Sequence, residues 1–226
     1  MTIPIIAGII ASILHVVSGP DHLAAVTPIA IETKKKVWRI GAYWGAGHLV
    51  GMLIIGLLFL AFKEVIPVET ISGYSEQLVA IVLIGIGIWL LYKLFYKEKI
   101  HSRPHIHTDG EVYIHQHDNA HQHGLHVKES KQNITSSFSI GVLHGLAGVA
   151  HFLLLLPALG FATQAESIQY IIGFAIGTVL AMTIYTMILG GITKSSSNNK
   201  SLLNTIRVSG GFFALIIGVY WLYLSL

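Results

Sequence analysis

Long apolar stretches recur along the chain and are separated by short polar connections. A helix needs roughly 20 mostly apolar residues to cross a membrane. These stretches predict an all-α integral membrane protein with six transmembrane helices. The six predicted spans are residues 3–31, 37–62, 77–97, 137–161, 167–190 and 206–226. Residues 98–136 form a long polar stretch, which we interpret as a loop.

The composition supports this interpretation and excludes two other classes of protein. Hydrophobic residues make up 53% of the 226 residues and charged residues only 11%, and the mean hydropathy is +0.67. A soluble domain carries about a quarter of its residues as charged side chains, so a soluble enzyme is excluded. A disordered chain needs low hydrophobicity and high net charge, and it is excluded as well.

Basic residues lie almost entirely on one side of the predicted spans. Thirteen of the 14 Lys and Arg residues fall between the first and second spans, in or beside residues 98–136, or between the fifth and sixth spans. Lys63 is the exception. Because Lys and Arg favour the cytoplasmic side of a membrane, we expect both termini outside and residues 98–136 in the cytoplasm. A bacterial inner (plasma) membrane is the expected location.

The first and fourth predicted spans share a sequence pattern. HVVSGPDHLAAVTP (residues 15–28) aligns with HGLAGVAHFLLLLP (residues 144–157) at an offset of 129 positions. Three spans per half would place the second half in the opposite orientation, an inverted repeat that is typical of transporters. We therefore predict a first three-helix repeat (1–97), a His-rich loop (98–136) and a second, inverted repeat (137–226). The identical pairs are His15 and His144, Gly19 and Gly148, His22 and His151, and Pro28 and Pro157.

Ionisable side chains inside the predicted spans form the candidate site. Such residues are costly in a membrane and usually mark an ion path, although a lone histidine also serves to hydrogen-bond neighbouring helices. The chain has no cysteine, so its ligands are nitrogen and oxygen atoms, which suit divalent first-row metals better than Cu(I). The candidate metal ligands are His15, Asp21, His22, His48, His144 and His151.

The spacing of His15 and His22 makes a break in the first span necessary. Seven positions correspond to roughly 10 Å along a continuous helix, which is too far for both side chains to bind one ion. Ser18-Gly19-Pro20 supplies the break, because proline favours the first turn of a new helix. Ser18 and Asp21 also fit a capping box, which would give Asp21 a structural role instead of a ligand role.

The inverted orientation predicts which ligands meet. Where the first and fourth spans cross, Asp21 and His22 should approach His144, and His15 should approach His151. His48 would join either group. One compact site and two stacked sites both remain open.

The predicted loop carries eight further histidines. His-rich tracts are typical of metal binding, and neutral imidazoles on a flexible segment would capture several ions weakly. An unselected linker and a pH-sensitive segment are the alternatives. The eight residues are His101, His105, His107, His115, His117, His121, His123 and His126.

The segment HVVSGPDHLAA resembles the H-x5-D-H signature of the HupE/UreJ permeases, which are hydrogenase- and urease-accessory membrane proteins. These belong with the nickel/cobalt transporter superfamily, whose eight-span members have H-x4-D-H, so this chain is more similar to the six-span branch. The resemblance implies transport of Ni²⁺ or Co²⁺, with His15, Asp21 and His22 at the signature positions. The His-rich loop also resembles that of efflux members, so import and export both stay open.

These features predict a transporter of a divalent transition-metal ion, with Ni²⁺ or Co²⁺ favoured, and not an enzyme. We expect no cofactor besides the transported ion. The expected partners are that ion and the lipid bilayer, and no nucleic acid is expected. A homo-oligomer is left open. The alternatives are a permease for Zn²⁺ or Mn²⁺, an accessory protein that hands metal to a partner, and an intramembrane metal-dependent hydrolase. Against the hydrolase, H-E-x-x-H is absent, and Asp21 is the one carboxylate in a predicted span.

Overall fold

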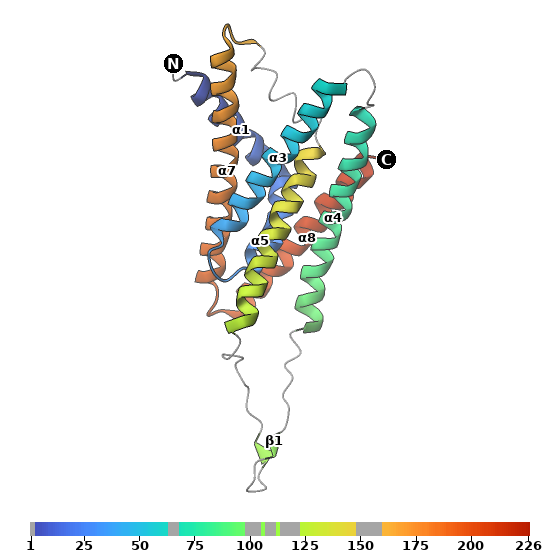
Figure 1. The fold of residues 1–226 in the computed structure, drawn as a ribbon. Helices are drawn as coiled ribbons and strands as arrows, with labels where there is room; N and C mark the ends of the chain where they lie inside the picture. The colour runs from blue at the N-terminus through green and yellow to red at the C-terminus, as the bar shows by residue number, and fades with distance from the viewer. Residues whose placement is uncertain (1–2, 63–67, 98–104, 107–111, 114–122, 148–159) are drawn as a thin grey trace.

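The computed structural model describes residues 3–62, 68–97, 105–106, 112–113, 123–147 and 160–226. In this part of the chain the fold is helical, with one antiparallel pair of two-residue strands between α4 and α5 (Figure 1). The helices are α1 (Ile3–Ser18), α2 (Pro20–Glu32), α3 (Trp38–Phe62), α4 (Val68–Lys97), α5 (His123–Leu146), α7 (Gln164–Ser195) and α8 (Lys200–Leu224), and the strands are β1 (His105–Ile106) and β2 (Val112–Tyr113).

The helices confirm an integral membrane protein. Among the described residues, α7, α8 and large parts of α3 and α4 are long and apolar enough to cross a membrane. The bent pair α1 and α2 brings the number of candidate spans from four to five. The fourth predicted span, 137–161, lies partly outside the described residues, so the structure does not confirm the six-span count.

Several helices extend beyond the apolar segments that predicted them. The loop prediction for residues 98–136 is wrong at its C-terminal end, because α5 already begins at His123. Similarly, α4 begins at Val68 and α8 at Lys200, before the predicted starts at 77 and 206. Hydropathy detects only the part of a helix that lies in lipid, whereas residues such as Lys, Glu and Gln continue a helix into water without difficulty.

Close contacts between small residues hold the helices in pairs. α1 packs against α7, α3 against α5, and α4 against α8. At Gly47 of α3 an added Cβ atom would overlap the carbonyl oxygen of Phe138 in α5, and at Gly173 of α7 it would overlap that of Ile5 in α1. Small residues at close approaches between helices are usual in membrane proteins.

The short helix α2 is the centre of the molecule. It contacts the other six described helices, and ten of its 13 residues are buried. A helix that is apolar on every side is stable only when it is surrounded by other protein or lipid. Side chains at the start of α2 are consequently held inside the bundle.

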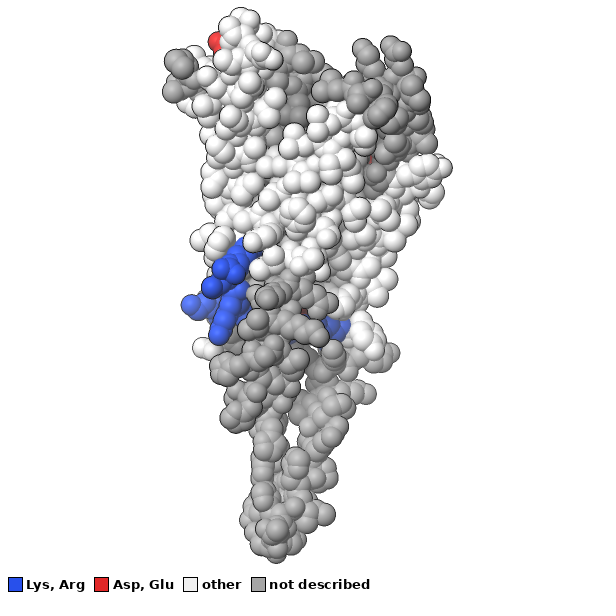
Figure 2. All heavy atoms as spheres, viewed as in Figure 1, with Lys and Arg blue, Asp and Glu red and all other residues white. Residues whose placement is uncertain are grey.

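The far end of α2 is fixed by an ion-pair network. Glu32, whose side chain is 5% exposed, lies 2.5 Å from Nζ of Lys93 in α4 and 2.8 Å from Nε of Arg207 in α8. Figure 2 shows Lys and Arg side chains gathered in a patch at the left of the view, near the end of α7, with a smaller group to its right. This end of the helical bundle is thus strongly basic.

Candidate metal site

A sharp break between α1 and α2 creates the site. The two helices meet at 72°, and Gly19 between them has an extended backbone with φ −90° and ψ 93°. Proline disfavours helical geometry in the residue before it and is itself favourable at the first position of a helix. The predicted break is therefore present, and it brings the ring centroids of His15 and His22 to 4.5 Å.

The alternative role of Asp21 in a capping box with Ser18 is wrong. The residue that caps α2 is Gly19, and it makes no side-chain capping bond. The Ser18 hydroxyl instead donates a hydrogen bond to the carbonyl oxygen of His15, 3.2 Å away. Pro20 is the first residue of α2, so the cap is Gly19, one position after Ser18. Asp21 therefore makes its contacts elsewhere.

Asp21 joins α2 to α5. Its Oδ2 lies 2.6 Å from Nε2 of His144, and its Oδ1 lies 3.5 Å from Nδ1 of the neighbouring His22. The expected approach of Asp21 and His22 to His144 is therefore present. His144 is positioned by the last turn of α5, whose close packing against α3 fixes its depth in the bundle.

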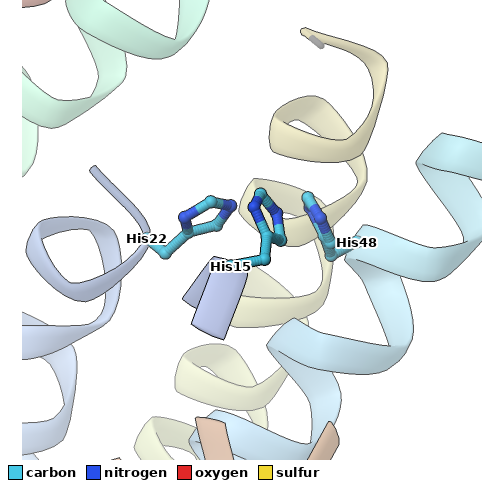
Figure 3. Close-up of side chains that lie close together, drawn as sticks. All are labelled: His15, His22 and His48. Atoms are coloured by element: carbon cyan, nitrogen blue, oxygen red, sulfur yellow. The ribbon is translucent and has the colours of Figure 1, made fainter. Parts of the chain in front are cut away.

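His48 of α3 completes the cluster, which we call the His/Asp cluster: His15, Asp21, His22, His48 and His144. Two groups within it have ligand atoms that all lie within 4.8 Å of one another. The first group is His15, His22 and His48, whose rings face one another in Figure 3. The second is Asp21, His22 and His144.

Burial makes this cluster chemically unusual. Asp21, His22, His48 and His144 are 2%, 1%, 0% and 1% exposed, whereas His15 is half-buried. A buried carboxylate beside imidazoles is costly unless charges are paired or a cation is bound. Four imidazoles and one carboxylate are a donor set that suits a divalent first-row metal ion.

Trp44 is a member of the site that the sequence reasoning missed. Its indole is fully buried and stacks on the ring of His48, with centroids 5.1 Å apart and planes inclined by 9°. The same indole lies 5.4 Å from the rings of His22 and His144. The available signal was the four-residue spacing of Trp44 and His48, which places both side chains on one helix face.

The remaining predicted ligands fall outside this description. His151 lies outside the described residues, and so do five of the loop histidines. His105 lies in β1, and His123 and His126 lie in α5. The expected approach of His15 to His151 stays a prediction.

Comparison with known proteins identifies the family. The family model for the transmembrane region of cytochrome c biogenesis proteins matches residues 4–220. The chain belongs to this family. A family member, the urease accessory protein UreH of Bacillus sp. (strain TB-90), is 33% identical over 96% of this chain and 89% of its own length. This match confirms the resemblance to urease-accessory membrane proteins.

Two chloroplast proteins of Arabidopsis thaliana, FOR GROWTH AND FERTILITY 1 and 2, are also similar, at 32% and 33% identity over 83% of this chain. The chain spans about half of their length, 50% and 47% respectively. No solved structure matches the chain. The family description refers to cytochrome c biogenesis, but these 226 residues contain no cysteine, so they have no thiol with which to do redox chemistry.

Proposed function

We propose that this protein carries a divalent transition-metal ion across the membrane and that Ni²⁺ or Co²⁺ is the ion. The observation that supports this most strongly is the position of the His/Asp cluster. Its residues come from four helices and meet at a broken helix in the centre of the bundle, and all of them except the half-buried His15 are almost completely shielded from solvent. Broken helices with ion ligands near the midplane are typical of transporters, and the similarity to a urease accessory protein agrees with a nickel-linked role.

The metal ligands in this proposal are His15, Asp21, His22, His48 and His144, with His151 as a further ligand from the second half. Ni²⁺ and Co²⁺ accept imidazole and carboxylate ligands together. Zn²⁺ and Mn²⁺ accept the same donors, so the ligand types alone leave these two ions as the alternative cargo.

We further propose the six-span inverted repeat, with residues 1–97 and 137–226 as its halves and residues 98–136, which include the first part of α5, as the connection between them. Two correspondences support it. α1 ends at Ser18 and α5 at Leu146, which is within one residue of the repeat offset of 129 positions. In addition, the α1–α7 pair and the α5–α3 pair pack through matching positions.

That packing match is specific. Gly177 of α7 approaches the carbonyl oxygen of Ile9 in α1, and Gly47 of α3 approaches that of Phe138 in α5. Ile9 and Phe138 are 129 positions apart, and Gly47 and Gly177 are 130 positions apart. The same contact therefore occurs twice, each time between a helix of one half and a helix of the other. The patch of Lys and Arg in Figure 2 supports a cytoplasmic location for the end of the bundle where α7 ends.

Reconstituted vesicles test the proposed function. The protein in liposomes should accumulate Ni²⁺ or Co²⁺ in preference to Zn²⁺ and Mn²⁺, and comparison with and without a pH gradient identifies the driving force. His22→Gln and Asp21→Asn should abolish flux, while His105→Gln, which removes an imidazole outside the cluster, should keep it. Transport of none of the four ions, or wild-type flux in both cluster variants, would overturn the proposal.

A further inference from the structure

His22 occupies a special place in the His/Asp cluster because it belongs to both groups of ligands. One group is His15, His22 and His48, and the other is Asp21, His22 and His144. A metal ion lies about 2.0–2.1 Å from a histidine nitrogen, so two nitrogens on one ion are at most about 4.2 Å apart. With ligand atoms already within 4.8 Å of one another, either group needs only small side-chain movements to bind an ion.

The two groups lie on two sides of the His22 ring. Nδ1 lies 3.5 Å from Oδ1 of Asp21, which places this nitrogen on the side of the second group. Figure 3 shows the opposite edge of the ring directed at His15, with His48 beyond. The edge-to-face angles agree, at 78° to the ring of His15 and 86° to that of His48. The two nitrogens of an imidazole point in different directions, so they cannot both bind the same ion.

The two groups also differ in charge and in access. The first offers three neutral imidazoles and includes His15, which is only half-buried. The second contains the carboxylate of Asp21, and all its members are at most 2% exposed. A divalent ion would therefore meet the uncharged group first and be held more strongly by the group that contains the carboxylate.

Simultaneous occupancy is strongly unfavourable. Two divalent ions on either side of one imidazole ring would repel each other at short range in a medium of low dielectric constant. A single carboxylate offsets only part of that charge. One ion at a time is the arrangement that the electrostatics allow.

We propose that His15–His22–His48 and Asp21–His22–His144 are two alternately occupied stations for one ion, with His22 as the ligand common to both. The ion moves between them by exchanging one nitrogen of His22 for the other, so it keeps a ligand from this residue in each resting position. This inference rests on the proposed metal transport and specifies its central step.

Cobalt binding to the purified full-length chain tests the inference. The eight loop histidines are first replaced by glutamine so that they do not contribute to binding. In this background we expect one Co²⁺ per chain. His15→Gln/His48→Gln should retain one Co²⁺ at the station with the carboxylate, and Asp21→Asn/His144→Gln should retain one at the all-histidine station. His15→Gln/His48→Gln should bind Co²⁺ nearly as tightly as the background chain, because the station with the carboxylate is intact. Asp21→Asn/His144→Gln should bind it roughly tenfold or more weakly, a loss typical of damage to a metal site.

The absorption spectrum of the bound Co²⁺ distinguishes the two stations, because it depends on ligand type and geometry. The two double variants should give different spectra, and adding His22→Gln to either should remove the bound ion. Both should lose flux in vesicles while they keep binding, since each lacks one station. Circular dichroism and gel filtration confirm that every variant is folded.

Three results would overturn the two-station arrangement: two Co²⁺ ions bound per chain, complete loss of binding in both double variants, or retention of Co²⁺ after His22→Gln in either of them. Failure of the proposed function would look different, because the background chain itself would then bind no Co²⁺ and carry no ion.

Discussion

At the scale of single residues, Trp44 determines how the imidazoles of the site face one another. Its indole stacks on His48 and touches the rings of His22 and His144. Its Nε1 has no hydrogen-bond partner among the described residues, so the side chain gains its stability from packing alone. Groups that orient metal ligands commonly change metal affinity by 10–100-fold when they are removed. We therefore assign Trp44 a positioning role.

Two replacements of Trp44 distinguish its contribution to stability from its effect on the orientation of the imidazoles. Trp44→Ala leaves a cavity in a fully buried place and should lower the free energy of unfolding by about 3–5 kcal/mol. It should also weaken Co²⁺ binding roughly tenfold and change the spectrum of the bound ion. Trp44→Phe keeps a flat ring against His48 and should preserve that spectrum. Unchanged Co²⁺ affinity and spectrum in Trp44→Ala would refute the positioning role.

At the scale of elements, the decisive feature is the break between α1 and α2. A continuous helix would separate His15 and His22 by roughly 10 Å, whereas their ring centroids lie 4.5 Å apart. The break also leaves little space at Gly19, because an added Cβ atom there would overlap the ring of His22 and approach Oδ1 of Asp21. Any residue can adopt the φ of −90° found at this position. Glycine is therefore required for the lack of space and not for its backbone conformation.

Gly19→Ala should therefore displace His22 and reduce metal affinity and flux at least tenfold. A suitable control is Gly85→Ala in α4, where an added Cβ meets nothing within 4 Å. The control should transport like the wild type, and it should be slightly more stable, because alanine favours a helix by up to about 1 kcal/mol over glycine. Equal flux in the two variants would show that the space at Gly19 has no role in the site.

At the scale of the whole molecule, the three helix pairs α1–α7, α3–α5 and α4–α8 surround the central helix α2. The ion pairs of Glu32 with Lys93 and Arg207 fix α2 to the basic end of the bundle. The cluster consequently lies deep in the protein, between a basic end and the end where α1 and α7 begin. This arrangement predicts a defined orientation across the membrane.

Labelling at the two ends of α7 tests the orientation. The chain has no cysteine, so Ala162→Cys and Asn198→Cys each introduce one unique thiol, just before and just after this helix. In intact cells an impermeant reagent should label position 162 and leave position 198 unlabelled until the membrane is opened. Labelling of both thiols from outside would disprove the proposed topology.

The His-rich loop should tune transport without selecting the ion. Selectivity requires ligands held in a fixed geometry, and among the described residues the buried His/Asp cluster provides such ligands. Replacement of its eight histidines by glutamine should change the apparent affinity for the ion but keep the order of preference among Ni²⁺, Co²⁺, Zn²⁺ and Mn²⁺. Metal bound by the loop should be lost as the pH falls through about 6.5, because protonated imidazole is no ligand. A changed order of preference would place the selective site in the loop.

The sequence by itself determined the membrane class, the positions of most spans and the identity of the candidate ligands. These follow from local features: apolar length, the break at Ser18-Gly19-Pro20 and the cost of placing His or Asp in lipid. It also predicted that Asp21 would approach His144, from the sequence pattern that residues 15–28 and 144–157 share. Local chemistry and recurring sequence patterns can be read directly from a linear chain.

Only the tertiary structure decided how the ligands are grouped. Whether His48 faces His15 or His144 depends on the rotation of α3, which follows from close packing around its glycines and not from its own sequence pattern. The same holds for Trp44, whose role depends on three partners from separate helices, and for Glu32, whose ion pairs join residues far apart in the chain. Such contacts depend on how helices cross, and the crossing is set by side chains on both partners at once.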